Sequence, residues 1–145
     1  MCNRLTVRRI GESKRQLAKL KAFAAPMMKD VRFRDRVSRL EVELMALEIT
    51  NLRFLDQMRR TGQPPGADVS MLKIRGTEIQ QSLTELMMQA VGPLAQPFAP
   101  SNGDAGFDSF TAGLAPRYCN FRKTSIYAGS NEIQRNIISK MTLGL

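Results

Sequence analysis

Apolar residues that recur at every third or fourth position over 31–60 constrain the fold more than any other feature of the sequence. One set, which we call the first stripe, consists of Phe33, Val37, Leu40, Leu44, Leu47, Leu55 and Met58. A second set beside it, the second stripe, consists of Val42, Met45, Ile49 and Leu52. This spacing matches the turn of an α-helix and puts each set along one side of it. Two apolar sides on one long helix predict that several neighbours cover it, as at the centre of a bundle or at a subunit interface.

Asn51 interrupts the first stripe between Leu47 and Leu55. A buried asparagine needs a hydrogen-bond partner, and pairing it can fix the register of neighbouring helices. The alternative is that Asn51 faces water, as polar residues within an apolar stripe commonly do at a surface. Both interpretations agree with the sequence.

The rest of the chain carries the same helical spacing, and strand-like alternation is hard to find. Further helices are predicted over 3–25, 67–91, 116–126 and 131–143. The segment "TGQPPGAD" at 61–68 predicts a turn. The stretch 92–116 is rich in proline and glycine, which predicts an irregular excursion with one short helical turn near 107–110. We therefore expect one all-α domain over 1–145, a four-helix-type up-down bundle with a short C-terminal helical appendage.

The residue types that are absent restrict the chemistry. The chain has 145 residues and no histidine, so it cannot by itself assemble a Ser/His/Asp or Cys/His nucleophilic system. No metal site is expected, because Cys2 and Cys119 are too few to hold zinc without histidine. Two cysteines make no disulfide framework, which indicates free thiols in the cytoplasm. We expect no membrane association, because no signal-peptide pattern or run of membrane-spanning length is found.

The chain is strongly basic, with 22 Lys and Arg against 13 Asp and Glu and a formal net charge of +9. This charge suits nucleic-acid binding, but aromatic residues make up only 6% of the chain, and no stacking series or docking motif accompanies the cations. We therefore expect no nucleic-acid partner. The basic residues instead predict a solvated surface, a surface for an acidic partner or one for a phosphate-bearing ligand.

The last segment, "SIYAGSNEIQRNIISKMTLGL" at 125–145, places three small residues directly before a predicted helix: Ala128, Gly129 and Ser130. A helix that begins after such a turn presents unpaired backbone N–H groups, which can bind a phosphate or another hydrogen-bond acceptor. The alternative is a capped terminal helix without a ligand, in which Ser130 or Asn131 is the N-cap.

Four segments resemble a known family. They are "RFRDRVSRLEVELMALEITNLR" at 32–53, "GADVSMLKIRGTEIQQSLTELMMQAVGP" at 66–93, "YCNFRKTSIY" at 118–127 and "IYAGSNEIQRNIISKMTLGL" at 126–145. They are similar to successive helices of the C-terminal domain of acyl-CoA dehydrogenases. The phrases "RKTSIY" and "GSNEIQRNIISKM" resemble the large-subunit branch of the pimeloyl-CoA dehydrogenase type.

The resemblance implies an oxidoreductase that uses FAD to remove a proton and a hydride from an acyl-CoA thioester. It also implies an N-terminal helical domain and a middle β-domain that this sequence does not contain. Expected assemblies are a homo-dimer or tetramer, or a hetero-oligomer with a second dehydrogenase subunit. We expect the chain alone to be inactive and to hold FAD weakly or not at all, because those domains would form most of the flavin site.

The resemblance further implies a set of cofactor-binding residues in three segments, namely Arg4, Thr6, Gln89, Gly92, Ser130 and Glu132. The alternative for Arg4 is a solvated surface arginine. Pro93 stands where the family has a second glycine and removes a backbone N–H, which weakens the expectation for Gln89 and Gly92. Ser130 has the firmest physical basis, because it also occupies a helix start.

No catalytic base is assigned. Many members of the family have a glutamate directly before the turn glycine, and here that position is Ala128, whose methyl group cannot accept a proton. The alternative to the enzyme interpretation is a stand-alone helical oligomerisation or regulatory module without catalytic activity. That alternative also accounts for the two apolar stripes.

Overall fold

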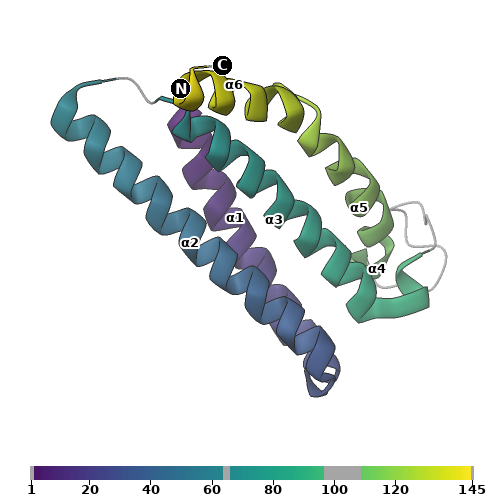
Figure 1. Cartoon of the computed structure of the whole chain (residues 1–145). Helices are drawn as coiled ribbons and strands as arrows, with labels where there is room; N and C mark the ends of the chain where they lie inside the picture. Colours follow the sequence, from purple (N-terminus) through teal and green to yellow (C-terminus); the bar gives the residue numbers. More distant parts are fainter. Residues whose placement is uncertain (1, 64–65, 97–108, 145) are drawn as a thin grey trace.

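A computed structural model describes residues 2–63, 66–96 and 109–144 (Figure 1), with side chains described for all of these except residues 2–8, 68, 109 and 110. The long helices are α1 (Cys2–Phe23), α2 (Val31–Thr61) and α3 (Asp68–Val91). Shorter helices follow, namely α4 (Ser109–Ala112), α5 (Leu114–Arg122) and α6 (Asn131–Leu143), together with the 3-10 turns η1 (Met27–Lys29), η2 (Gly92–Ala95) and η3 (Lys123–Ser125). The described residues form helices and no strand, which confirms the all-α prediction.

Local signals set the ends of α2. Asp30 precedes the helix in an extended conformation, and its carboxylate accepts a hydrogen bond of 2.9 Å from the backbone N–H of Arg32. At the other end Gly62 adopts φ 65°, and its N–H donates to the carbonyl of Met58. A glycine at this position closes the helix without the steric cost that a side chain meets at positive φ.

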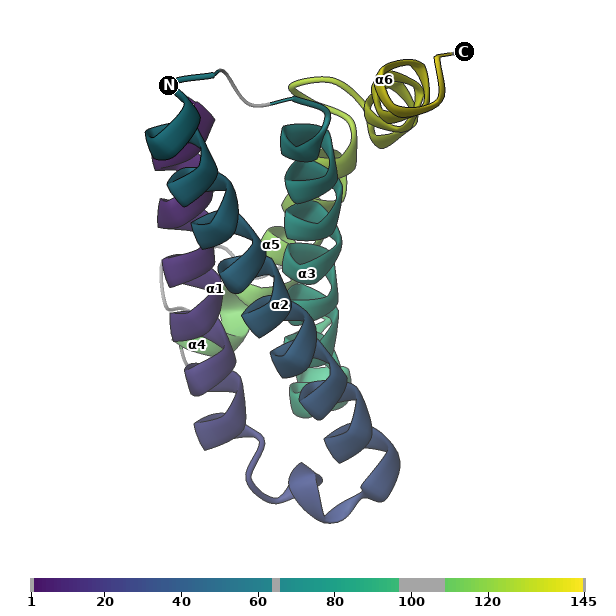
Figure 2. The same ribbon diagram turned by 60° about the vertical axis from the view of Figure 1, so that its left-hand side comes forward.

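Consecutive long helices run antiparallel, so α1 and α3 point the same way, and α5 and α6 return along the other side of α3 (Figure 1). Helix α3 packs against α1, α2, α5 and α6. Figure 2 views α6 nearly end-on while α1, α2 and α3 run lengthwise, so α6 crosses one end of the bundle. The architecture is thus the expected up-down bundle with a C-terminal appendage, but α3 rather than α2 lies at its centre.

The core forms where the first stripe of α2 meets α1 and α3. Its largest fully buried side chains are Leu20, Val37, Leu44, Thr77, Ile79 and Leu86. Burial of each such aliphatic side chain contributes roughly 1.5–3 kcal/mol. Leu55 and Met58, at the end of the first stripe, are only half-buried. Asn51 is buried, with 3% of its surface exposed, so the interpretation that it faces water is wrong.

The second stripe remains uncovered within the chain. Val42, Met45, Ile49 and Leu52 are exposed by 65%, 56%, 52% and 57%. Of the two alternatives predicted for α2, the centre of the bundle is wrong, because α1 and α3 both pack against the side that carries the first stripe. The other alternative, a subunit interface, stays a prediction. The apolar side of α6 is also largely open, with Ile133 and Met141 exposed.

The predicted boundaries hold to within a few residues, and the clearest difference is at α5. That helix begins at Leu114 rather than Pro116, because a proline is tolerated in the first turn, where the backbone N–H has no helical partner. It ends at Arg122 and continues as the 3-10 turn η3. Of the short turn predicted near 107–110, positions 107 and 108 lie outside the described residues, and α4 begins at Ser109. The Cys119 thiol is free and exposed.

Candidate functional site

The turn before α6 has an unusual backbone. Ala128 adopts φ 58° and Gly129 adopts φ 86°, so two consecutive residues lie in the left-handed region. An alanine there costs roughly 1–2 kcal/mol, and such strain concentrates at functional turns. Glycine is favoured at position 129 by this φ, and a Cβ atom there would lie 2.6 Å from Nε2 of Gln134, so the end of that flexible side chain would have to move.

The first turn of α6 gathers two of the predicted site residues. Ser130 is the N-cap, and its hydroxyl accepts a hydrogen bond of 3.3 Å from the backbone N–H of Ile133. Glu132 lies on the same turn with 75% of its side chain exposed, and it faces Arg135 at 3.7 Å. Its own backbone N–H and the Ser130 hydroxyl hold the pKa of the Glu132 carboxyl below the usual 4.5. The helix start therefore keeps this carboxyl ionised.

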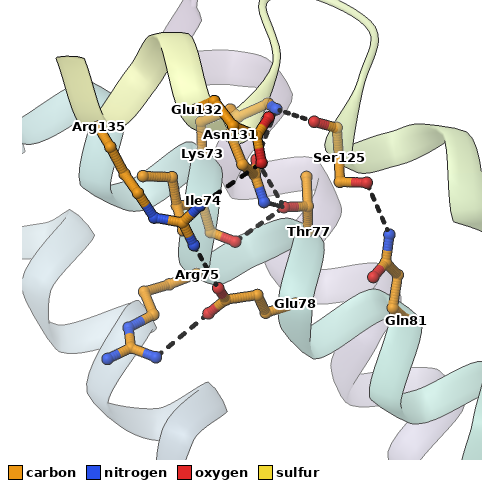
Figure 3. A network of polar contacts seen from close by, with 10 residues as sticks. All are labelled: Lys73, Ile74, Arg75, Thr77, Glu78, Gln81, Ser125, Asn131, Glu132 and Arg135. Carbon is orange, nitrogen blue, oxygen red and sulfur yellow. Dashed lines mark hydrogen bonds and ion pairs between the residues drawn. The ribbon is translucent and has the colours of Figure 1, made fainter. Parts of the chain in front are cut away.

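A buried polar cluster holds this turn on α3 (Figure 3). The Lys73 ammonium donates a hydrogen bond of 2.8 Å to Oδ1 of Asn131 and one of 3.4 Å to the carbonyl of Ser125. The Asn131 amide contacts the Thr77 hydroxyl at 3.4 Å, and that hydroxyl donates to the carbonyl of Ile74 at 2.8 Å. Thr77 and Asn131 are both buried, so their polar atoms depend on these partners.

One turn further along α3, Gln81 fixes the end of α5. Its Nε2 atom donates to the carbonyl of Arg122 at 3.2 Å and contacts the hydroxyls of Thr124 and Ser125. The Arg122 guanidinium returns a hydrogen bond of 2.9 Å to the Gln81 carbonyl. The segment between α5 and α6 is thus tied to α3 at both of its ends.

Sequence reasoning missed Lys73, Thr77 and Gln81, although a signal for them exists. These polar residues stand four positions apart on α3, so they form one continuous ridge along the helix. Such a ridge on one helix of a predicted bundle indicates a polar contact with another segment.

Gln89 and Gly92 lie elsewhere. The Gln89 side chain is exposed and hydrogen-bonds to Arg36 and to Glu85. Gly92 ends α3 with φ 69° and ψ −143°, a conformation that favours glycine. Gln89 lies sixteen positions after Lys73, which is about 24 Å along the helix at 1.5 Å per residue. Within one chain, the Gln89–Gly92 pair and the Ser130–Glu132 pair therefore lie at opposite ends of α3.

Arg4 and Thr6 belong to the first turns of α1, and their side chains lie outside the described residues. Helix α1 begins at the same end of the bundle as α6 (Figures 1 and 2). Within the described ranges, no group of three or more Cys, Asp or Glu side chains lies close enough to hold a metal ion. In the same part of the chain, every helix is too short or too polar to cross a membrane.

Comparison with known proteins shows the family. A family model described as "Acyl-CoA dehydrogenase, C-terminal domain" matches residues 2–143. The chain therefore belongs to the acyl-CoA dehydrogenase family, of which it represents the C-terminal helical domain. A search of curated protein sequences finds no significant match.

Solved structures show the same fold. The structure of PigA with FAD and proline superposes with a TM-score of 0.75 at 21% identity, covering 99% of this chain and 36% of PigA. The Tcur3481–Tcur3483 steroid acyl-CoA dehydrogenase gives 0.71 at 17% identity, covering 99% of this chain and 37% of that one. The ChsE4–ChsE5 complex from Mycobacterium tuberculosis gives a TM-score of 0.69 at 21% identity, covering 94% of this chain and 36% of that one. The chain thus spans little more than a third of the length of these relatives.

Proposed function

We propose that this chain acts as the C-terminal helical part of an FAD-dependent acyl-CoA dehydrogenase, in which it supplies subunit contacts and one part of the FAD site. The observation that carries the proposal is the first turn of α6, where a strained turn and the Ser130 cap are held by buried hydrogen bonds to α3. Family membership over residues 2–143 supports it.

The residues at the start of α6 fit the chemistry of a flavin nucleotide. Backbone N–H groups at a helix start and a serine hydroxyl suit the oxygens of a phosphate. The ionised Glu132 carboxylate does not suit a phosphate, but it accepts hydrogen bonds and so suits the hydroxyls of a ribose or ribityl chain. When bound, FAD would accept the hydride from the β-carbon of the acyl group. Ser130 and Glu132 would hold and orient the bound FAD.

The other predicted contacts fit a site shared between chains. Because Gln89 and Gly92 lie at the opposite end of α3 from Ser130, they would contact a different part of the cofactor or a cofactor held by another protomer. The exposed second stripe offers an apolar surface through which protomers or a second dehydrogenase subunit would associate. The similar ChsE4–ChsE5 structure is that of a complex, which supports such an assembly.

Catalytic competence would require residues outside this chain. Ala128 has no group that accepts a proton. Its positive φ costs free energy, so the hydrogen bonds from α3 and not a carboxylate hold the turn in place. We expect the purified chain to show no dehydrogenation of acyl-CoA substrates in the presence of FAD and an artificial electron acceptor. Activity should appear in a longer polypeptide that also carries the N-terminal helical domain and the middle β-domain.

The sharpest test uses Ser130→Asp in that longer polypeptide. Aspartate caps a helix as well as serine does, so α6 should stay intact, while its negative charge opposes a phosphate at the helix start. We expect flavin retention to fall at least fivefold, equivalent to about 1 kcal/mol. The matched control is Asn136→Asp, which adds the same charge at an exposed position of α6. Equal retention in the two variants would contradict the assignment of Ser130, and turnover by the isolated chain would contradict the partial-site proposal.

The alternative function is a helical oligomerisation module without a cofactor, and the uncovered second stripe favours it. The two functions predict different amounts of flavin bound to the purified longer polypeptide. A longer polypeptide that assembles but retains no flavin would support the module.

A further inference from the structure

A cleft of about 280 Å³ lies between α1, α3 and the turn before α6. Ile10 and Leu72, both buried core residues, form part of its apolar lining together with Val69. The volume is near the lower end of the range for ligand pockets, which is about 300–1,000 Å³. The cleft is therefore large enough for a small molecule with an apolar body.

Two cations line the same cleft. Arg9 reaches it from α1 and Lys73 from α3. None of the described residues that line the cleft is acidic, and neither cation forms an ion pair with a described carboxylate. The exposed Glu132 acts on Lys73 through its charge, beyond ion-pair distance, and its effect is larger than that of Arg9. An apolar cleft with two positive charges and no acidic lining residue suits a ligand with an apolar chain and an anionic end.

The donors of both cations are only partly used. An ammonium has three N–H groups, and that of Lys73 donates two of them, to Asn131 and to the Ser125 carbonyl. The Arg9 guanidinium has five N–H groups, and its described hydrogen bond is donated to the Tyr127 hydroxyl at 3.4 Å. Burial lowers the pKa of Lys73, Glu132 raises it, and the neighbouring Arg9 lowers it to a smaller extent. Burial and the like charge of Arg9 both disfavour the charged ammonium, and a bound anion would offset them.

Gly76 widens the cleft. It lies in the middle of α3, where its missing side chain leaves space, and a Cβ atom there would lie 3.9 Å from Cδ2 of Leu47. That distance is an ordinary contact, so the helix would accept a side chain at this position. A larger side chain would occupy the cleft instead of the ligand.

We propose that this cleft binds a small amphipathic carboxylate, with the apolar chain against Ile10 and Leu72 and the carboxylate between Arg9 and Lys73. A carboxylate has two oxygens that can accept from the two cations at once. The inference goes beyond the proposed flavin site, because this chain supplies every residue that it uses.

The test is a calorimetric titration of the full chain with octanoate. Saturable binding is expected. Octanamide, which has the same chain without the charge, should bind at least tenfold more weakly, and inorganic phosphate, which lacks the chain, should not bind detectably. Equal binding of octanamide and octanoate, binding of phosphate alone, or no saturation with octanoate would overturn the proposal.

Variants locate the site. Arg9→Gln and Lys73→Met should each weaken octanoate binding about tenfold or more. The control Lys19→Met removes the same charge from an exposed position of α1 and should leave binding unchanged. Gly76→Leu, which keeps both charges, should abolish binding while circular dichroism shows full helicity. If Gly76→Leu fails to fold, Arg9→Gln decides, because an affinity equal to that of Lys19→Met would overturn the proposal.

Discussion

The Lys73 ammonium on α3 donates a hydrogen bond of 2.8 Å to Oδ1 of Asn131, the first residue of α6. The two residues are 58 positions apart in the sequence. This contact, together with that from Thr77, attaches the beginning of the last helix to the centre of the bundle. The turn that carries Ser130 is therefore positioned by buried polar atoms and not by apolar packing alone, since much of the apolar side of α6 is exposed.

Removing the Asn131 side chain should destabilise the chain. Asn131→Ala removes one hydrogen-bond partner from the partly buried Lys73 ammonium and one from the buried Thr77 hydroxyl, which costs about 1–3 kcal/mol. Urea unfolding followed by circular dichroism measures this change. The control is Asn136→Ala, an exposed position of α6, which should stay within about 0.5 kcal/mol of the parent chain. Equal stabilities of the two variants would show that the cluster does not hold α6.

Glu132 should contribute to the fall of the free energy of unfolding at acidic pH. Its pKa is held below 4.5 in the folded chain, so between that lowered value and 4.5 the unfolded chain binds more protons. The stabilisation is therefore fully present above pH 4.5 and is lost as the pH falls through the folded-state pKa. Glu132→Gln should flatten the decline of the free energy of unfolding below pH 4.5. Glu43→Gln, at an exposed position of α2, should leave that decline unchanged.

Replacing each of two glycines by alanine should change the free energy of unfolding in opposite directions. Gly76→Ala should raise the free energy of unfolding by roughly 0.5–1 kcal/mol, because alanine favours the helix and its Cβ atom makes an ordinary contact with Leu47. Gly62→Ala should lower it by roughly 1–2 kcal/mol, because φ 65° is strained for a residue with a Cβ atom. Denaturant unfolding of both variants checks the pair. Stabilisation by both substitutions would refute the assignment of Gly62 to a left-handed cap.

The second stripe should control association. Replacing Met45 and Ile49 together by glutamine should convert assembled species to monomers in sedimentation experiments at high protein concentration, because the substitution removes an apolar contact surface. The stability of the monomer should change by no more than about 0.5 kcal/mol per site, since both side chains are more than half exposed within the chain. Leu94→Gln, at an exposed position of η2, is the control and should leave association unchanged. A parent chain that is strictly monomeric would contradict the prediction outright.

Much of the helical structure could be predicted because its causes are local. The range 131–143 agrees with α6 at both ends, since Ser130 caps the first turn and Gly144 adopts φ 72° directly after the last. Asp30 and Gly62 bound α2 in the same way. Ser130 and Glu132 could be placed on one helix start for the same reason. Caps, turn residues and helical spacing act over a few neighbouring residues, so one sequence contains them completely.

Only the tertiary structure decided which of these helices became central and which apolar stripe became buried. The two stripes of α2 are alike in sequence, yet the first lies in the core and the second is exposed, because α1 and α3 approach from one side. The packing of α5, η3 and α6 against α3 put Lys73, Thr77 and Gln81 next to the segment before α6. The packing of α1 against α3 brought Lys73 beside Arg9. Burial and the pairing of polar atoms depend on residues that are distant in the chain and near in space, and periodicity within one helix does not identify those residues.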